Sequence, residues 1–250
     1  MISVIMPSHN SDITLDRAVR SVLNQTYKNL ELIIVDNGSV KLPKLSDDIL
    51  MDPRVKMLVY AEVLGAANAR NVGVREASGE YVAFLDSDDY WTPDKLEKQI
   101  KVMEKFVVQG ETPRLVFTGR SIVDAAGQET GRYIGCNKIV RRELLLRSNQ
   151  INCSSVLIRR ETALRFPFPD GNFHEDYVVW LEVLEEGGYA AGINRPLLKY
   201  RKNSSSKSGN KIRSAIMTYN VYRYVGMSTF ECLKHMITYT VEGIRKHYFS

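Results

Sequence analysis

The sequence lacks any apolar run of the roughly 18 or more residues that a membrane-spanning helix needs. Its beginning, MISVIMPSHN, lacks the basic start of a secretory signal peptide and passes directly into a strand-like run. Cysteine is also scarce, because Cys136, Cys153 and Cys232 are scattered, odd in number and without metal-ligand spacing. We therefore expect no spanning helix, no signal peptide and no disulfide framework, and we expect reduced thiols in a cytoplasmic protein.

The sequence also lacks a strong charge of either sign. It has 34 Lys and Arg residues against 29 Asp and Glu residues, and the net charge of +5 is concentrated in residues 211–250. The body of the chain has no basic stripe interleaved with stacking aromatic residues, so we expect no nucleic-acid partner. An anionic small ligand or a membrane surface is the expected partner. With 44% hydrophobic and 25% charged residues, the chain reads as one large globular domain, alone or with an appended element.

Short apolar runs alternate with helix-like segments through the first half of the chain. This alternation predicts βαβ units and a mainly parallel sheet, in which ligands gather at the carboxyl ends of the strands. Thr92 is expected as the N-cap of one helix, with Pro93 as its first helical residue. The predicted strands are 2–7, 30–39, 55–60 and 81–86, and the predicted helices lie around 15–22, 66–77 and 93–106.

The second half of the chain is less regular. We expect strands at 115–124, in the early part of 154–164, at 189–193 and at 196–201. Helices are expected at 141–147, late in 154–164 and at 174–188. A polar, flexible loop at 202–210 then precedes residues 211–248, which show helical periodicity with many aromatic and basic residues.

A cluster of three carboxylates follows the fourth predicted strand. In EYVAFLDSDDYWTPDK the apolar run ends at Asp86, Asp88 and Asp89, whose like charges raise one another's pKa unless a positive partner is present. Hard oxygen ligands of this kind suit Mg²⁺ or Mn²⁺, which take further ligands from substrate phosphates. The alternative is that the aspartates cap the following helix. An EF-hand is excluded because its glycine and distal glutamate are missing.

Several motifs, taken in order, resemble the family 2 glycosyltransferases of GT-A fold. The resemblance covers roughly residues 1–205 and implies an α/β, Rossmann-like, mainly parallel central sheet flanked by helices. It divides this domain into a nucleotide-binding half of about 1–110 and an acceptor half of about 111–205, and it leaves 206–250 as a C-terminal helical appendage. The motifs are VIMPSHN, SVLNQTYKNLELIIVDNGS, AANARNVGVREASGEYVAFLDSDDYWTPDKL, HEDYVVWLEV and YRKNSSS.

The resemblance implies a set of nucleotide contacts. Pro7 and His9 would border the base, although the family more often has Tyr at the second position. Asn37 stands where the family commonly has an acid, so UDP is expected while TDP and GDP stay open. Turn chemistry and surface ion pairs are the simpler roles for such residues. The full implied set is Pro7, His9, Asn10, Asp36, Asn37, Arg70, Asp86 and Ser87.

The resemblance also implies the metal and acceptor sites. Asp88, together with Asp86, would hold Mn²⁺ or Mg²⁺, and Asp176 would be the base that deprotonates an acceptor hydroxyl. Glu175 would bind the acceptor or orient that base; on sequence alone, both acids could simply complement a helix dipole. Trp180 lies one turn beyond Asp176, either as a sugar platform or as a core residue. The acceptor or loop candidates are Asp89, Trp180, Ser154, Tyr200 and Arg201.

The implied activity is inverting transfer of a sugar from a nucleoside diphosphate, UDP by expectation, to a saccharide acceptor that is lipid-linked. Such enzymes serve bacterial capsule, exopolysaccharide, teichuronic acid or lipopolysaccharide assembly at the inner face of the cytoplasmic membrane. Helical residues 211–248 could contact that membrane, form a homodimer or pack as an appendage. A sugar nucleotidyltransferase and a non-catalytic partner protein that binds nucleotide sugars stay as alternatives.

Overall fold

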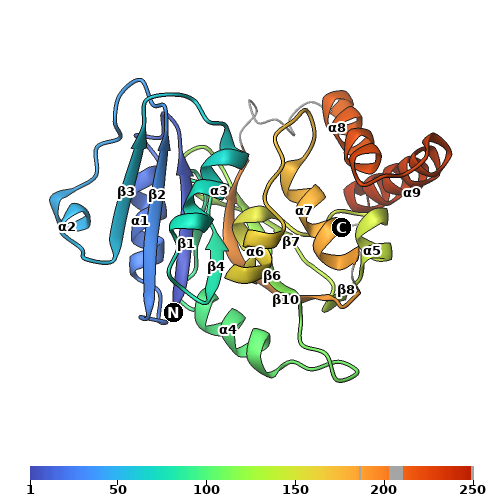
Figure 1. Cartoon of the computed structure of the whole chain (residues 1–250), viewed down its shortest axis with the longest axis horizontal. Helices are drawn as coiled ribbons and strands as arrows, with labels where there is room; N and C mark the ends of the chain where they lie inside the picture. The colour runs from blue at the N-terminus through green and yellow to red at the C-terminus, as the bar shows by residue number, and fades with distance from the viewer. Residues whose placement is uncertain (186, 203–210, 249–250) are drawn as a thin grey trace.

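The computed structural model describes residues 1–185, 187–202 and 211–248. These residues form an α/β fold in which helices cover both faces of one twisted central sheet (Figure 1). The prediction of a mainly parallel sheet flanked by helices is confirmed. The predicted boundary between residues 205 and 206 lies outside the described residues, as does most of the predicted loop at 202–210.

The first four long strands form a parallel half-sheet. Side chains alternate across a strand, so Ile2, Val4 and Met6 enter the core on one face while Ile5 enters the core on the other. Three of its strands are therefore buried on both faces, which explains their nearly continuous apolar runs, whereas the edge strand at 55–60 is only partly buried. In spatial order its strands are β3 (Val55–Tyr60), β2 (Leu30–Asn37), β1 (Ile2–Ser8) and β4 (Tyr81–Phe84).

The second half of the sheet is mixed. β9 (Leu157–Arg159) runs antiparallel to both β4 and β6 (Leu115–Val123), and β10 (Ala190–Arg201) runs parallel to β6. The two predicted final strands are one strand, because β10 absorbs its irregular middle as register shifts between Ile193 and Leu198. Three short antiparallel strands had no prediction: β5 (Tyr90–Trp91), β7 (Glu129–Ile134) and β8 (Ile139–Val140).

The helices pack in two layers, with the 3-10 turn η1 (Cys153–Ser155) between β8 and β9 in sequence. One face of the sheet is covered by α1 (Leu15–Leu23), α2 (Asp47–Leu50) and α4 (Lys95–Lys105). The other face is covered by α3 (Ala66–Glu76), α5 (Arg142–Arg147), α6 (Arg160–Arg165) and α7 (Glu175–Glu185), with residues from α8 (Lys211–Tyr224) and α9 (Thr229–Tyr248).

The prediction that Thr92 caps a helix beginning at Pro93 is wrong. Helix α4 begins at Lys95, with Asp94 as its N-cap residue. The reason is that β5 pairs with β10, and the Thr92 amide continues this pairing by donating to the Leu197 carbonyl at 3.0 Å. The Thr92 hydroxyl donates to Asp94 Oδ1 at 2.9 Å instead of accepting from a helix amide.

Helix α3 lies close to β1 and β2, and this closeness depends on a glycine. A Cβ atom at Gly73 would lie 2.3 Å from Cγ2 of Ile5, so a larger residue would push the helix away from the sheet. Arg70 lies one turn earlier on the same side of α3. The close contact at Gly73 therefore helps to set where Arg70 sits relative to the end of β4.

The C-terminal helices α8 and α9 pack on each other, and they contact α7 and α5 respectively. Their inner side chains join the core, where Tyr222 and Cys232 are fully buried. In Figure 1 they lie at the end of the molecule opposite β3. Over the described residues, no helix combines the length and apolarity needed to cross a bilayer.

Candidate active site

Two neighbouring cavities open where the parallel strands end, the place where ligands gather in such sheets. The larger cavity, of about 710 Å³, is lined by the ends of β1, β2 and β4 and by residues from α3, α7 and β10. The smaller cavity, of about 450 Å³, is lined by residues of β6, η1, α7, β10, α8 and α9. Three residues line both cavities: Arg70, Asp86 and Glu175.

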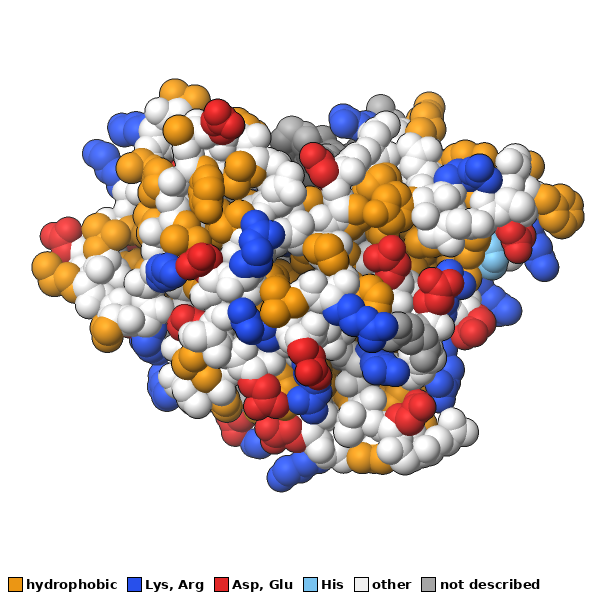
Figure 2. Space-filling model, in the orientation of Figure 1, with side chains coloured by type: hydrophobic (Ala, Val, Ile, Leu, Met, Phe, Trp, Pro, Cys, Tyr) orange, Lys and Arg blue, Asp and Glu red, His pale blue; other side chains and the backbone are white. Residues whose placement is uncertain are grey.

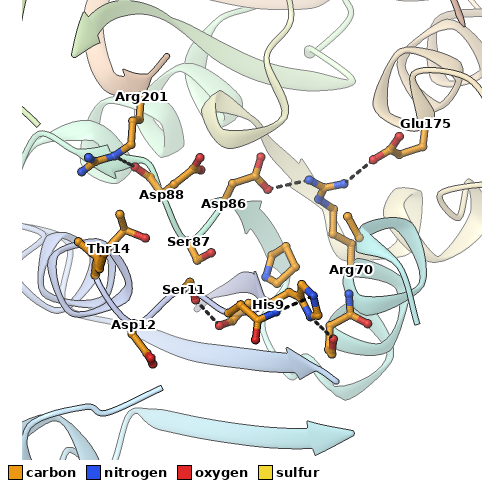
Figure 3. A pocket seen from close by; sticks show the side chains of 16 residues that line it. His9, Ser11, Asp12, Thr14, Arg70, Asp86, Ser87, Asp88, Glu175 and Arg201 are labelled. Carbon is orange, nitrogen blue, oxygen red and sulfur yellow. Dashed lines mark hydrogen bonds and ion pairs between the residues drawn. The ribbon is translucent and has the colours of Figure 1, made fainter. Parts of the chain in front are cut away.

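These three residues form an ion-paired wall between the cavities. Arg70 donates from Nη2 to Asp86 Oδ1 at 2.6 Å and from Nη1 to Glu175 Oε1 at 3.2 Å, and its side chain is only 6% exposed (Figure 3). Burial lowers the pKa of Arg70, but the carboxylates of Asp86 and Glu175 outweigh that effect and raise it. Its guanidinium also lies 5.4 Å from the Phe168 ring centroid. The guanidinium is therefore fixed on three sides.

The far end of the larger cavity is formed by the loop after β1 and the loop after β2, which are hydrogen-bonded to each other. Asn10 adopts a positive φ of 49°, and its Oδ1 accepts from the Val40 amide at 3.0 Å. The His9 ring is fixed by its neighbours: Nδ1 donates to the Asn37 carbonyl at 2.7 Å, and Nε2 accepts from Asn10 Nδ2 at 3.0 Å. Asn37 accepts through Oδ1 from the amides of Leu64 and Gly65, which places the start of α3.

The carboxylate cluster is held by its backbone. The Asp86 amide donates to Ser154 Oγ at 3.1 Å, and the Arg201 amide donates to Asp89 Oδ1 at 2.9 Å. Burial, and then repulsion by Asp86, raises the pKa of Asp88 to about 6. Burial raises the pKa of Asp89 even more strongly, with Asp88 and Asp86 adding to the effect. The cluster thus holds more negative charge than the neighbouring protein groups stabilise.

The donor atoms at this point fit a divalent cation that also binds a ligand. Among the described residues, no three His, Cys, Asp or Glu side chains gather to hold a metal ion alone. Asp86 and Asp88 nevertheless both line the larger cavity, and carboxylate pairs of this kind leave coordination positions for waters and phosphate oxygens. A cation there would also offset the repulsion that raises the pKa of Asp88.

The smaller cavity contains a carboxylate suited to proton transfer near neutral pH. Asp176 lies in the first turn of α7, where its Oδ1 accepts from the Tyr177 amide at 2.8 Å. Burial raises the pKa of Asp176 to about 7, Glu175 adds to this rise, and Arg70 opposes it. A general base works best when its pKa lies near the operating pH.

Consecutive residues at the end of β10 line different cavities, because side chains alternate along a strand. Tyr200 lines the smaller cavity and Arg201 the larger one. Arg201 donates from Nε to the Asp88 carbonyl at 3.1 Å and from Nη1 to the Ala125 carbonyl. Arg201 therefore joins β10 to the carboxylate cluster, as Figure 3 shows.

Most of the residues singled out from the sequence line one of the cavities, and four do not. Trp180 is fully buried against Phe84 and Phe168, so it offers no exposed ring face and is a core residue rather than a sugar platform. Asp36 is also fully buried, and its carboxylate accepts from the Ser39 amide and hydroxyl, which closes the turn after β2. Asp89 and Ser154 are buried supports of the Asp86–Asp88 loop.

Several lining residues were missed by the sequence analysis. Arg120, Asn149, Asn152, Ser214 and Tyr239 line the smaller cavity without standing in a short motif. Ser214 and Tyr239 belong to α8 and α9, so the predicted appendage completes this cavity. At this cavity the C-terminal helices pack against the rest of the fold, since His174 Nε2 lies 3.2 Å from Ser214 Oγ. In the larger cavity the missed residues are Ser8 at the end of β1, four residues of the segment after it, and Ala66 at the start of α3; the four are Ser11, Asp12, Ile13 and Thr14.

The chain resembles known proteins along its whole length. A family model described as Glycosyl transferase family 2 matches residues 3–164. The Escherichia coli UDP-Glc:alpha-D-GlcNAc-diphosphoundecaprenol beta-1,3-glucosyltransferase WfgD is 34% identical over 253 residues, covering 100% of this chain and 96% of that protein. TuaG of Bacillus subtilis, named for teichuronic acid biosynthesis, is 36% identical over 230 residues, covering 90% of this chain and 88% of that protein.

Solved structures share the fold. S. aureus TarS 1–349 in complex with UDP-GlcNAc aligns with a TM-score of 0.71 at 16% identity, covering 96% of this chain and 71% of that one. The mannosyltransferase PcManGT from Pyrobaculum calidifontis, in complex with GDP-Man and Mn²⁺, aligns with a TM-score of 0.66 at 18% identity, covering 95% and 68%. At these identities the likeness concerns the fold alone, and the predicted GT-A fold is confirmed.

The raised pKa of Asp176 predicts that this residue destabilises the folded protein at neutral and alkaline pH. An unfolded aspartate loses its proton near 3.8, whereas the folded carboxyl loses it near 7, so the cost develops between these values and is complete above pH 7. Asp176→Asn should therefore raise the free energy of unfolding by about 1–3 kcal/mol near pH 8 and by less near pH 5. Urea unfolding at both pH values, with a metal chelator present, measures this difference.

The matched control for this measurement is Asp12→Asn, which neutralises an exposed aspartate at the rim of the larger cavity. Its effect on unfolding should be small at both pH values. A pH-independent effect of Asp176→Asn, or a loss of stability at both pH values, would contradict the assignment of a strained carboxyl at this position.

Proposed function

The chain belongs to the family 2 glycosyltransferases, and within this family we propose that it is a metal-dependent, inverting enzyme that transfers a sugar from a UDP-sugar to a lipid-linked saccharide. Its relatives are glycosyltransferases of bacterial polysaccharide biosynthesis. One observation carries the proposal: a cavity with a carboxylate pair and a cavity with a candidate base meet at a shared wall of Arg70, Asp86 and Glu175. A transferase needs such a meeting point between donor and acceptor.

The larger cavity is the proposed donor site. Its far end offers Pro7, the fixed ring of His9 and the edge of Asn37 for a nucleotide base, and its near end offers Asp86 and Asp88 for a metal-bound diphosphate. UDP is favoured because WfgD, at 34% identity, carries UDP-Glc in its name. The GDP-Man complex of PcManGT shows that the same fold accepts another base, so the nucleotide is the first quantity to test.

The divalent cation, when bound, neutralises charge on the departing diphosphate. Asp88 and Asp86 would hold it, with the remaining ligands coming from phosphate oxygens and water. Arg70 keeps Asp86 oriented and brings a second positive charge to the meeting point of the cavities. Arg201, which bonds to the Asp88 carbonyl, brings a third.

The smaller cavity is the proposed acceptor site, with Asp176 as the base. The acceptor oxygen forms a bond to the anomeric carbon of the donor sugar while the bond from that carbon to the diphosphate oxygen breaks. The electron pair of the broken bond leaves with the diphosphate, and the acceptor proton goes to the Asp176 carboxylate. Glu175, paired with Arg70 and lining both cavities, is placed to orient the sugar hydroxyls.

The placement of the cavities favours inversion. The diphosphate would leave on the side of Asp86 and Asp88, and the acceptor would attack from the side of Asp176, across the shared wall. Attack and departure on opposite faces of one carbon give a single displacement with inverted configuration. On this proposal, the predicted nucleotide-binding half of the chain supplies most of the donor site, and the acceptor half and C-terminal helices supply most of the acceptor site.

A lipid-linked acceptor would bring the enzyme to a membrane, and the C-terminal helices offer a surface for it. Figure 2 shows hydrophobic side chains at the surface over α8 and α9, with Lys and Arg side chains among them. On α9, an outward stripe of Phe230, Leu233, Ile237 and Val241 is between 55% and 79% exposed. The spacing of the stripe is helical, as in helices that lie in a bilayer interface.

The occupant that we propose for this stripe is an anionic bilayer surface rather than a second copy of the chain. Arg213, Arg223 and Lys234 are exposed on the same two helices and match negative lipid head groups. The same helices line the acceptor cavity through Ser214 and Tyr239, so the cavity would open near the lipid. The proposed place of action is thus the inner face of the cytoplasmic membrane.

The alternatives are weaker. A sugar nucleotidyltransferase is disfavoured because the chain matches the family 2 glycosyltransferase model. A non-catalytic nucleotide-sugar-binding protein would have no use for a half-buried carboxylate in the smaller cavity whose pKa is about 7. That alternative predicts donor binding without turnover, which the experiments below separate.

Donor and metal binding form the first test. UDP titrated calorimetrically in the presence of Mn²⁺ should bind at least tenfold more tightly than without the metal, and more tightly than GDP or TDP. Asp88→Asn should abolish the gain from the metal, because one carboxylate cannot hold the cation. Asp47→Asn, which neutralises an exposed aspartate on α2 that lines neither cavity, is the control. Metal-independent nucleotide binding would contradict the metal assignment. Tighter binding of GDP or TDP would show that UDP is not the donor nucleotide.

The base assignment predicts a separation of turnover from binding. Asp176→Asn should lower kcat by about 10²–10⁴ while donor affinity changes little, because general-base help is lost but the larger cavity stays intact. In the wild-type enzyme, kcat/KM should fall as the pH drops below about 7, where Asp176 becomes protonated. Undiminished transfer by Asp176→Asn, or retained anomeric configuration in the product by NMR, would exclude this mechanism.

Membrane contact is tested by flotation with phosphatidylglycerol vesicles. The wild-type protein should float with them, and Phe230→Ser with Ile237→Ser should reduce the floated fraction at least fivefold by removing apolar surface from the interface. Val40→Ser, which replaces a residue that is 95% exposed on the opposite lobe, is the control. The proposed membrane contact would be contradicted if the wild-type protein did not float with the vesicles. It would also be contradicted if the protein were a dimer that the two substitutions dissociate.

A further inference from the structure

The smaller cavity contains a half-buried arginine, Arg120, that nothing in the proposed mechanism uses. Arg120 lies on β6, and its side chain lines the cavity beside Tyr200. Its guanidinium carbon is 5.6 Å from the Tyr200 ring centroid, so the ring provides a platform for one face of the cation. The edge of the guanidinium carries the hydrogen-bond donors.

Those donors have no acceptor among the residues that the structure describes. Arg120 Nε is buried and has no hydrogen-bond partner, and no hydrogen bond or ion pair to the described residues involves the rest of the guanidinium. The other arginines around the site are used: Arg70 bonds to two carboxylates, and Arg17 and Arg201 bond to backbone carbonyls. Arg120 is thus a cation with unused donors in the wall of a binding cavity.

A charged group with a buried, unpaired donor costs free energy, which a bound ligand can offset. Burial lowers the pKa of Arg120, although electrostatic interactions with nearby acidic groups, among them Asp89 and Asp176, oppose this effect. An arginine remains charged throughout the physiological range. Asp176 lies in the same cavity but forms no ion pair with Arg120 within 4.0 Å. A negative group supplied by a ligand would complete the site.

The geometry of the Arg120 guanidinium indicates which kind of ligand it binds. A guanidinium presents paired donors that match phosphate oxygens, whereas a neutral sugar hydroxyl uses only one of them. The other polar side chains of the cavity, Asn149, Asn152 and Ser214, are neutral and suit sugar hydroxyls. A phosphorylated saccharide would therefore place its ring between these groups and Asp176 and its phosphate at Arg120.

We propose that Arg120 binds the phosphate attached to the acceptor sugar, so that the smaller cavity selects saccharides linked through phosphate over neutral glycosides. The inference rests on the proposed function, since it takes the smaller cavity as the acceptor site. It is consistent with the name of WfgD, whose acceptor is a diphosphate-linked GlcNAc. In that acceptor, the phosphate and the reacting hydroxyl belong to one sugar ring, as a single 450 Å³ cavity requires.

The experiment compares two acceptors with UDP-glucose as donor: GlcNAc α-linked through a diphosphate to an alkyl chain, and GlcNAc α-linked directly to the same chain. The wild-type enzyme should prefer the diphosphate by at least tenfold in kcat/KM. Arg120→Gln should reduce this preference at least tenfold, mainly through KM, and Arg120→Lys should retain part of it. Arg132→Gln, which removes an exposed charge from the neighbouring strand β7, should leave the preference unchanged.

A binding measurement separates failure of this inference from failure of the proposed function. Calorimetry with UDP and Mn²⁺ present should show GlcNAc 1-phosphate binding at least tenfold more tightly than methyl GlcNAc, with the difference lost in Arg120→Gln. UDP binding itself should be the same in both proteins. Equal preference in wild type and variant, or no preference in the wild type, overturns the role of Arg120 even if transfer proceeds. Absence of UDP binding would instead overturn the donor site.

Discussion

The two ion pairs of Arg70 with Asp86 and Glu175 join the parts of the molecule on which the site depends. Asp86 follows a parallel strand, Arg70 lies on the helix that precedes that strand, and Glu175 begins a helix 105 residues further along the chain. Removing one partner of such a buried group leaves uncompensated charge, which is typically costly by about 3–5 kcal/mol. The guanidinium therefore fixes the two halves of the fold at the place where the two cavities meet.

Around this arginine, the protein concentrates more carboxylates than it neutralises. Burial and mutual repulsion raise the pKa values of Asp88 and Asp176, which lie on either side of the Arg70 wall. The excess negative charge on one side suits a cation that arrives with a phosphorylated ligand, and the excess on the other side suits proton transfer. Each cavity thus has a destabilised carboxylate whose cost the proposed reaction partners would offset, and perturbed carboxylates of this kind cluster at functional sites.

The C-terminal helices belong to the site as well as to the surface. Their inner faces complete the smaller cavity through Ser214 and Tyr239, while their outer faces carry exposed apolar side chains. A helix that is apolar on both sides needs two environments, one being the core of the protein. In our proposals, the outer face contacts the membrane that holds the acceptor, and Arg120 in the smaller cavity binds the acceptor phosphate. Both contacts would bring the acceptor to Asp176.

The sequence by itself determined the α/β class and the parallel first half of the sheet, because periodicity depends only on neighbouring residues. Its resemblance to a family singled out Asp88 and Asp176, which line the larger and the smaller cavity. The sequence could not determine that Trp180 packs in the core, since one helix face can meet either a cavity or another helix. Nor could it find Arg120, which stands in no motif and gains its meaning from Tyr200 on another strand. Only the tertiary structure decided these roles, because burial and charge pairing are set by which distant segments pack together.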